Sequence, residues 1–360
     1  MKEKLSSFHL AILINMTQTG VVILVLPHLL ARYFGTNGWL ALIIVSAAVS
    51  LSIGLITAVY RLGEGQSIFE ILERFIPGLL LYPFYISLIC IWALLGCLTA
   101  KYYVLVFQMV AFPTVNPMAF KVAVDVLAFF LIIKTIYNIS KAATVFFWMS
   151  IWMLLLLFFF YGQFQWARLT PFVFQDSTYS AASFINIFPA YLGYELCLLL
   201  IPYCDRRTKF GSSVLIGHLL STVVYLYVSL VSYGFHGYEL LRHMQFPLMN
   251  LFAYVQLPFI QATENLLYGF LLFTTLITAV MYFWSAKEVA LRMIPKKRKL
   301  ITFVIVFLAY WISFIPDVLS EVQQWLKYLG YIEIGLAFGL PLGLIALLAV
   351  HKRRGRVSSA

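Results

Sequence analysis

Five of the ionisable side chains inside the long apolar runs of this 360-residue sequence could do chemistry: Lys101, Lys121, Asp125, Glu195 and Glu264. A charge at the centre of a bilayer costs about 2.5–3.5 kcal/mol on insertion scales, so such residues usually pair or serve a function. Lys121 and Asp125 are four residues apart, a spacing that brings two side chains together on a helix. We therefore expect these two residues to pair with each other and the other three to be functional candidates.

Glu195 is the strongest of these candidates. Its carboxyl group could bind an ammonium group or carry a coupling proton, and the alternative is a fixed structural hydrogen bond. Lys101 either extends its ammonium group to the outer headgroups or partners Glu195 or a substrate carboxylate. Glu264 lies in the outer third of its apolar run, where we expect a gating role or a place on the access path.

Two apolar runs are interrupted by polar, Gly and Pro residues. The first reads INMTQTGVVILVLP over 14–27, and the second reads INIFPAYLGYELCLLLIP over 185–202. A broken helix leaves N–H and C=O groups that lipid cannot satisfy, so breaks persist where they line a cavity or meet a ligand. The N-terminus of a half-helix also attracts anions such as carboxylates. The alternative is that Gly and Pro only kink these helices.

The sequence carries no enzyme motif. G-x-x-x-x-G-K-[ST], H-E-x-x-H and G-x-S-x-G are all absent, and the histidines follow no ligand spacing. The four cysteines, Cys90, Cys97, Cys197 and Cys204, form no C-x-x-C pair and are expected to be small core residues. We predict no catalytic residue, no metal site and no cofactor, and an ATP-driven pump is disfavoured.

The composition predicts an all-α integral membrane protein forming one membrane domain over 1–360. The chain is 62% hydrophobic and 11% charged, with a mean hydropathy of +0.92. A soluble domain is about half apolar and about a quarter charged. A membrane-spanning helix needs about 20 apolar residues. The stretches that qualify are 8–33, 38–60, 79–110, 118–137, 142–162, 183–203, 212–235, 259–286, 299–317 and 329–350.

The basic residues orient these ten stretches. With alternating helices and a cytoplasmic N-terminus, 19 of the 25 Lys and Arg residues fall in cytoplasmic segments. Lys and Arg concentrate on that side of membranes, so both termini, including the basic tail 351–360, are predicted to be cytoplasmic. The net charge of +11 is thereby explained without nucleic acid. The run PKKRKL over 295–300 is a positive-inside loop with a weak contribution from anionic lipid.

The ten stretches divide into two sets of five, 8–162 and 183–350. Because five is odd, the second set enters the membrane from the opposite side, as inverted repeats require. The two interrupted runs are then the first helix of each repeat, and such matching breaks point to a mid-membrane binding site. The residues predicted to line that cavity are Thr17, Gln18, Thr19, Gly20, Tyr191, Gly193, Glu195 and Lys101.

Two segments outside the ten stretches are informative. The segment 63–78 predicts a short amphipathic helix at the cytoplasmic interface, with Ser67 and Glu70 spaced as a capping box. The segment 235–258 is a long outer loop, either a lid or a simple connection.

The sequence resembles the spore germination permease family, the B subunits of nutrient germinant receptors within the amino acid–polyamine–organocation superfamily. The resemblance covers essentially the whole chain and depends on the order of four degenerate patterns. These are LSSFHLAILINMTQTGVVILVLP, NGWLALIIV, FPAYLGYELCLLLIPY and FPLMNLFAYVQLPFIQATENL. The sequence departs from the family at His9, where Gln is common, and at Asn37, where an acidic residue is frequent. Gln261 and Ala262 replace an acidic–basic pair, so any role of that pair is in doubt here.

The resemblance implies a LeuT-like fold with broken first and sixth helices. It also implies a transporter-like subunit that binds a small nutrient, an amino acid, and helps trigger endospore germination. The implied partners are an A-type subunit and a C-type lipoprotein in the spore inner membrane. Three other hypotheses are a proton-coupled amino acid permease, a nutrient-gated ion channel and a membrane scaffold without a ligand.

Overall fold

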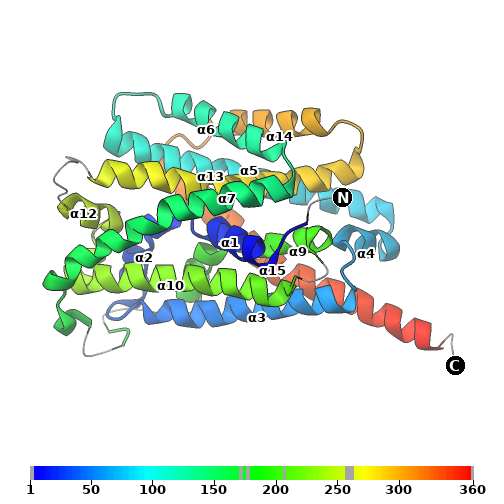
Figure 1. The fold of residues 1–360 in the computed structure, drawn as a ribbon, viewed down its shortest axis with the longest axis horizontal. Helices are drawn as coiled ribbons and strands as arrows, with labels where there is room; N and C mark the ends of the chain where they lie inside the picture. Colours follow the sequence, from blue (N-terminus) through cyan, green and yellow to red (C-terminus); the bar gives the residue numbers. More distant parts are fainter. Residues whose placement is uncertain (1–3, 170–172, 176–178, 206–207, 256–262, 358–360) are drawn as a thin grey trace.

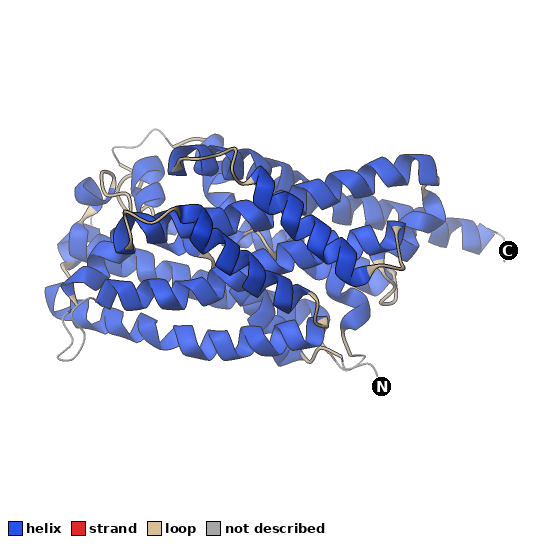
Figure 2. Ribbon diagram, turned by 90° about the horizontal axis from the view of Figure 1, so that it is seen from above, coloured by secondary structure: helices blue, strands red, loops and turns tan. Residues whose placement is uncertain are grey.

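The computed structural model describes residues 4–169, 173–175, 179–205, 208–255 and 263–357, and of residues 263–267 and 353–357 it describes only the backbone. Within these ranges the chain is helical, apart from an isolated β-bridge between Leu5 and Cys204 (Figures 1 and 2). Leu5 N–H donates to the carbonyl of Tyr203 over 2.9 Å, which ties the start of the chain to the end of the second interrupted run.

The helices of the first half cover the first five predicted stretches. They are α1 (Ser7–Gln18), η1 (Val21–Leu24), α2 (Leu26–Phe34), α3 (Leu40–Leu62), α4 (Ile68–Phe75), α5 (Gly78–Ala111), α6 (Pro117–Ile132), α7 (Ile136–Ile151), η2 (Trp152–Gln163) and η3 (Trp166–Leu169), where η denotes a 3₁₀-helix.

The second half begins with a chain of short helices and continues with long ones. They are α8 (Ala181–Ile187), η4 (Phe188–Tyr191), η5 (Tyr194–Leu196), α9 (Cys197–Leu200), η6 (Ile201–Tyr203), α10 (Phe210–His236), α11 (Tyr238–Leu241), α12 (Pro247–Tyr254), α13 (Thr263–Met293), α14 (Arg298–Ile312) and α15 (Leu319–Val357).

Among the described residues, six helices are long and apolar enough to cross a membrane, and a bent pair makes up to seven. The bent pair joins Ala181–Tyr191 to Tyr194–Tyr203 at an angle of 55°. The first predicted span is broken, and α6 and α14 have only 16 and 15 residues. The all-helical membrane fold is therefore established, while the ten-helix count and its two five-helix repeats stay a prediction.

The break in the first span lies slightly later than predicted. Thr17 and Gln18 belong to the last turn of α1, and the α-helix ends at Thr19. Gly20 then leads into the 3₁₀-helix η1, and Pro27 stands at the start of α2, where its missing N–H costs no hydrogen bond. The expectation that Thr17 and Gln18 are unwound was wrong, because both keep helical backbone up to the turn.

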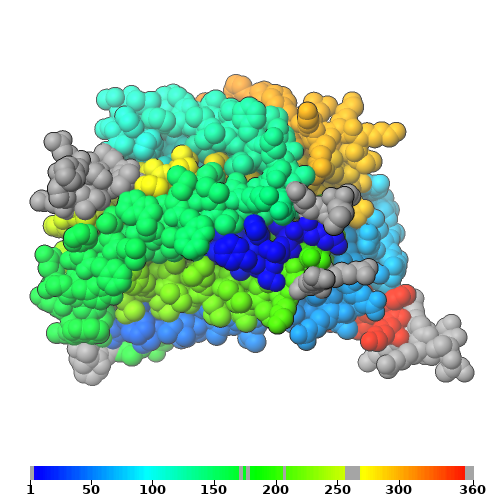
Figure 3. Space-filling model, viewed as in Figure 1, coloured from blue at the N-terminus to red at the C-terminus, as the bar shows by residue number. Residues whose placement is uncertain are grey.

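Helices α1 and α13 form the centre of the molecule. Helix α13 packs along α5, and α1 packs between α10, α7 and α13. The apolar window of α13 is 78% buried, whereas that of α15 is 22% buried and leaves much of its surface to the surroundings. Figure 3 shows the first residues of α1 in blue at the surface, and from Leu10 onward the helix is buried.

The predicted interfacial helix is α4. The Ser67 hydroxyl accepts from the N–H of Phe69, and the Glu70 carboxylate accepts from the N–H of Ser67, so the capping box is present. The predicted outer loop contains the short helices α11 and α12 in its described part, 235–255. Whether it acts as a lid stays a prediction.

Candidate functional site

A cavity of about 650 Å³ lies beside both helix breaks. Small-molecule sites usually occupy about 300–1,000 Å³, so its size suits a small ligand. The polar side chains at its inner end are Thr17, Gln18, Thr278, Tyr282 and Asn186. Apolar residues of η1, α2 and η4 complete the inner wall, so the cavity combines apolar surface with a few convergent polar groups.

The other end of the cavity is open and basic. Arg32 of α2 and Lys327 of α15 line it and are exposed, and His28 lies deeper on the same wall. Among the described residues that line the cavity there is no Asp or Glu. Helix α2, which carries Arg32, lies toward the side of the molecule opposite the two chain termini (Figure 1). This charge pattern favours a ligand with an anionic group.

Gln18 lines the cavity and carries a buried, unused acceptor. Its Nε2 donates to the carbonyl of Tyr191 over 2.5 Å and lies 3.3 Å from Nδ1 of His218. Because a carbonyl only accepts, this contact fixes the orientation of the amide. The Oε1 atom of Gln18 is buried and has no hydrogen-bond partner among the described residues. An orphaned acceptor of this kind costs free energy unless water or a ligand satisfies it.

Side chains from α10 and α13 satisfy the carbonyl groups at the breaks. The hydroxyl of Tyr225 lies 2.7 Å from the carbonyl oxygen of Gln18 and 2.8 Å from that of Ala190. The hydroxyl of Thr278 lies 2.9 Å from the carbonyl oxygen of Thr17. These contacts meet the requirement that non-helical backbone within a membrane be satisfied by protein. They also connect the two breaks to each other through Tyr225.

Gly193 is the point at which the two breaks touch. Its φ of +111° lies in the region that favours glycine, and an added Cβ would stand 2.8 Å from Cγ2 of Thr17 and 3.1 Å from the Thr17 carbonyl oxygen. Gly193 contributes to packing between the two breaks and is not among the residues that line the cavity. Gly193 was predicted to line the cavity, and the structure instead places it at this junction.

Thr19 and Tyr191 also lie away from the main cavity surface. Thr19 borders a separate cavity of about 70 Å³ between α1, α7 and α13. The Tyr191 hydroxyl donates to the carbonyl of Leu42 on α3 over 3.3 Å, and its own carbonyl accepts from Gln18. Of the eight predicted lining residues, the structure thus brings Thr17, Gln18 and Gly20 to the cavity wall.

Glu195 lies one layer behind the wall. Its carboxyl group accepts from the Gly193 N–H at 2.9 and 2.8 Å, and from the hydroxyl of Tyr282 at 3.2 Å. Tyr282 itself lines the cavity, so its hydroxyl connects the cavity to Glu195. The N–H contact resembles a cap on the second half of the broken helix.

Glu333 of α15 is a neighbour that the sequence analysis missed. It is completely buried, its carboxyl group lies beside that of Glu195, and its Oε1 accepts from the indole N–H of Trp92 over 2.9 Å. A signal existed, because Glu333 stands inside the apolar run 329–350 and the insertion cost applies to it equally. His218, Tyr225 and Tyr282 were also missed, since their roles depend on contacts distant in sequence.

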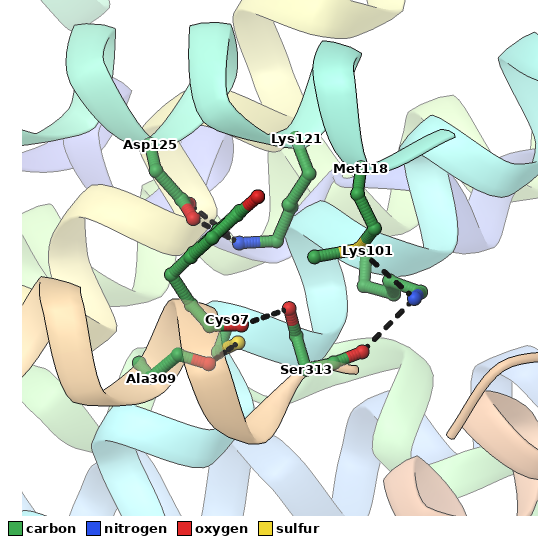
Figure 4. A network of polar contacts seen from close by, with 8 residues as sticks. Cys97, Lys101, Met118, Lys121, Asp125, Ala309 and Ser313 are labelled. Atoms are coloured by element: carbon green, nitrogen blue, oxygen red, sulfur yellow. Dashed lines mark hydrogen bonds and ion pairs between the residues drawn. The ribbon is translucent and has the colours of Figure 1, made fainter. Parts of the chain in front are cut away.

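Lys101 contacts residues other than Glu195. Its side chain is completely buried, and its ammonium group donates to the carbonyl of Ser313 over 2.9 Å and lies 3.2 Å from the sulfur of Met118 (Figure 4). The buried ammonium group therefore neither extends to the outer headgroups nor pairs with Glu195. In the same region Lys121 and Asp125 form the predicted ion pair, with an N–O distance of 2.6 Å.

Three other expectations have different outcomes. The side chain of Glu264 and the residues Gln261 and Ala262 lie outside the part of the chain that the structure describes. Cys97, Cys197 and Cys204 are buried free thiols, as expected, whereas Cys90 is exposed. Within the described ranges, no group of three or more His, Cys, Asp or Glu residues is placed to hold a metal ion.

Comparison with known proteins decides the family. Residues 4–322 match the profile of a family described as spore germination protein. The chain belongs to this family. Spore germination protein GerQB of Bacillus cereus is 22% identical over 92% of each chain. Spore germination protein A2 of Bacillus subtilis (strain 168) is 23% identical over 97% of each chain.

A solved structure gives the fold. Mhp1, a nucleobase-cation-symport-1 family transporter solved in a closed conformation with bromovinylhydantoin bound, matches with a TM-score of 0.68 at 13% identity. The match covers 96% of this chain and 78% of Mhp1. The spore germination protein described here is therefore a transporter-like membrane protein, with helices arranged as in a small-molecule transporter.

Proposed function

We propose that this chain is the membrane subunit of a germinant receptor and binds a small nutrient, an amino acid, in the cavity beside its two helix breaks. Binding then helps to trigger germination of the endospore. The partners that accompany this role are an A-type subunit and a C-type lipoprotein in the spore inner membrane, with both termini of this chain in the cytoplasm. Family membership and the transporter fold support the role.

The observation that carries the ligand class is the lining of the cavity, with the polar side chain of Gln18 at its wall and Arg32 and Lys327 at its opening. The buried Oε1 of Gln18 has no partner among the described residues and would accept from the ammonium group of an amino acid that reaches it. The carboxylate of the same ligand suits the basic opening, which Arg32 and Lys327 line. The remaining wall is apolar and accommodates an aliphatic side chain.

A direct binding measurement tests this proposal. The purified full-length protein is titrated calorimetrically with the proteinogenic amino acids and with simple sugars. We expect one or a few amino acids to bind. Substitution of Gln18 by Ala should weaken binding about 10–100-fold, because losing a charge-assisted hydrogen bond costs about 1.5–3 kcal/mol. The control is Gln108→Ala, because Gln108 lies outside the cavity lining. Equal losses in both variants, or binding by sugars alone, would contradict the proposal.

A second function, a proton-coupled amino acid permease, is favoured by the likeness to a transporter and by the buried carboxyl groups next to the cavity. Sustained uptake of a labelled amino acid by vesicles that contain this chain alone would establish it over a pure sensor. Ligand-dependent conductance without ligand flux would instead indicate a nutrient-gated channel. Co-purification from spore membranes tests the subunit partners independently of either result.

A further inference from the structure

Glu195 and Glu333 form a buried pair of carboxyl groups contributed by two helices far apart in the sequence. Their exposed fractions are 4% and 0%. One oxygen of Glu333 accepts from Trp92, and the other, Oε2, has no hydrogen-bond partner among the described residues although the Glu195 carboxyl group lies beside it. Two buried carboxylates side by side repel each other strongly, so the pair needs a balancing positive charge.

The surroundings supply no such charge. Tyr282 of α13 faces Glu195, Trp92 of α5 faces Glu333, and the neighbours on the broken helix are Tyr194 and Cys197. Ser52 of α3 lies next to Tyr194. Within the described part of the chain, neither glutamate is in a salt bridge with Lys, Arg or His. The described side chains that face the pair are therefore neutral at ordinary pH.

We propose that Glu195 and Glu333 together bind one proton at neutral pH and form a proton site directly behind the ligand cavity. The proton resides on Glu333 Oε2, and this hydroxyl donates to the carboxylate of Glu195. The hydrogen bond accounts for the missing partner of Oε2 and leaves one negative charge on the pair. That charge is stabilised by the Gly193 N–H and by the hydroxyl of Tyr282.

The donor groups around the pair favour a proton over a metal cation. The N–H groups of Gly193 and Trp92 both direct positive hydrogen atoms at carboxyl oxygens that a cation would need as ligands. Sodium or calcium requires several free oxygen ligands, and Ca²⁺ takes six to eight. The pair offers one unpartnered oxygen, Glu333 Oε2.

Tyr282 gives the site a connection to the cavity. It lines the cavity and donates to Glu195, so a single side chain lies between the cavity and the pair. The proton exchanges with water along this contact, and no co-reactant is required. The site does not depend on which molecule occupies the cavity, so its test is separate from that of the proposed ligand.

Infrared spectroscopy of the purified full-length protein at neutral pH tests the shared proton. We expect the carbonyl-stretch band of a protonated carboxyl group, and we expect its isotope shift in deuterated water. Glu195→Gln and Glu333→Gln should each lose this band, because the Gln amide donates to the remaining carboxylate and makes the proton unnecessary. The control Glu239→Gln changes an exposed glutamate on α11 and should keep the band.

Sodium dependence provides a second test on the unmodified protein. We expect the unfolding temperature to be the same in sodium chloride and in a salt of a bulky organic cation. A sodium-dependent rise would assign a cation to the pair and overturn the proton. An unchanged infrared band in both Gln variants, or no band in the unmodified protein, would also overturn it.

Discussion

Replacing Gly193 by Ala tests whether the contact between the two helix breaks holds the site together. The added Cβ would lie 2.8 Å from Cγ2 of Thr17 and 3.1 Å from its carbonyl oxygen. Thr17 cannot easily rotate away, because its hydroxyl donates to the carbonyl of Leu13 over 2.7 Å and its β-branched side chain is stiff in a helix. The new methyl group must therefore displace backbone or force an unfavourable rotamer.

The structure sets the magnitude. A residue with a Cβ in the left-handed region costs about 1–2 kcal/mol, and overpacking a buried site costs about 1–3 kcal/mol, so Gly193→Ala should lower the free energy of unfolding by about 2–5 kcal/mol. Thr17→Ser removes Cγ2 and keeps the hydroxyl, at a cost of about 0.8 kcal/mol for one methyl group. In the Thr17→Ser background the cost of Gly193→Ala should fall to about 1–2 kcal/mol, which is the cost of placing a residue with a Cβ in the left-handed backbone conformation.

The assay is reversible unfolding of the purified protein in mixed micelles with increasing denaturing detergent, arranged as a double-mutant cycle. Gly54→Ala on α3 is the control, because an added Cβ there meets no atom within 4 Å. The control should be neutral or slightly stabilising. A cost below about 1 kcal/mol for Gly193→Ala, or no coupling to Thr17→Ser, would refute the argument that the breaks are sterically interlocked.

Three further changes test other contacts by the same unfolding assay. Asp125→Asn should cost about 3–5 kcal/mol, because it strands the buried ammonium group of Lys121, and replacing both residues by apolar ones should recover most of that loss. Thr278→Val should cost about 1–3 kcal/mol by removing a donor from the end of α1. Thr275→Val is its matched control and should cost little, since its hydroxyl has no partner within the described residues. Tyr225→Phe should cost an amount similar to Thr278→Val, about 1–3 kcal/mol, because its single hydroxyl proton is shared between the carbonyls of Gln18 and Ala190; a neutral or stabilising effect would contradict this.

The sequence was sufficient for features that depend on local chemistry. The capping box of α4 follows from the spacing of Ser67 and Glu70, and the Lys121–Asp125 pair follows from one turn of helix. The break at Gly193 was indicated by a Gly between apolar residues. Its positive φ is a conformation that Gly adopts at little cost and that most other residues avoid. Local rules also located the break near Gly20, although Thr17 and Gln18, predicted to be unwound, are helical.

The direction of each side chain at the breaks could not be predicted. Helical periodicity assigns faces only while the helix continues, and it is lost at Thr19 and at Leu192. Gln18 lies on the cavity wall, whereas Glu195, which was predicted to lie there too, is one layer behind it. Lys101 was misjudged for a different reason, since its partners are the carbonyl of Ser313 and the sulfur of Met118, and backbone carbonyls carry no sequence signature.

The same contacts suggest how occupancy of the cavity is transmitted. A ligand shifts a conformational equilibrium only by the difference in its affinity for the two states. A ligand that donates to Gln18 Oε1 holds an amide whose other end already binds the Tyr191 carbonyl, so it favours the arrangement in which α1 and the second broken helix are joined. The Gly193 N–H on that helix also holds Glu195. Any movement that separates the breaks therefore changes the donors around Glu195, so the proposed ligand cavity and the proposed proton site share the same short segment of backbone.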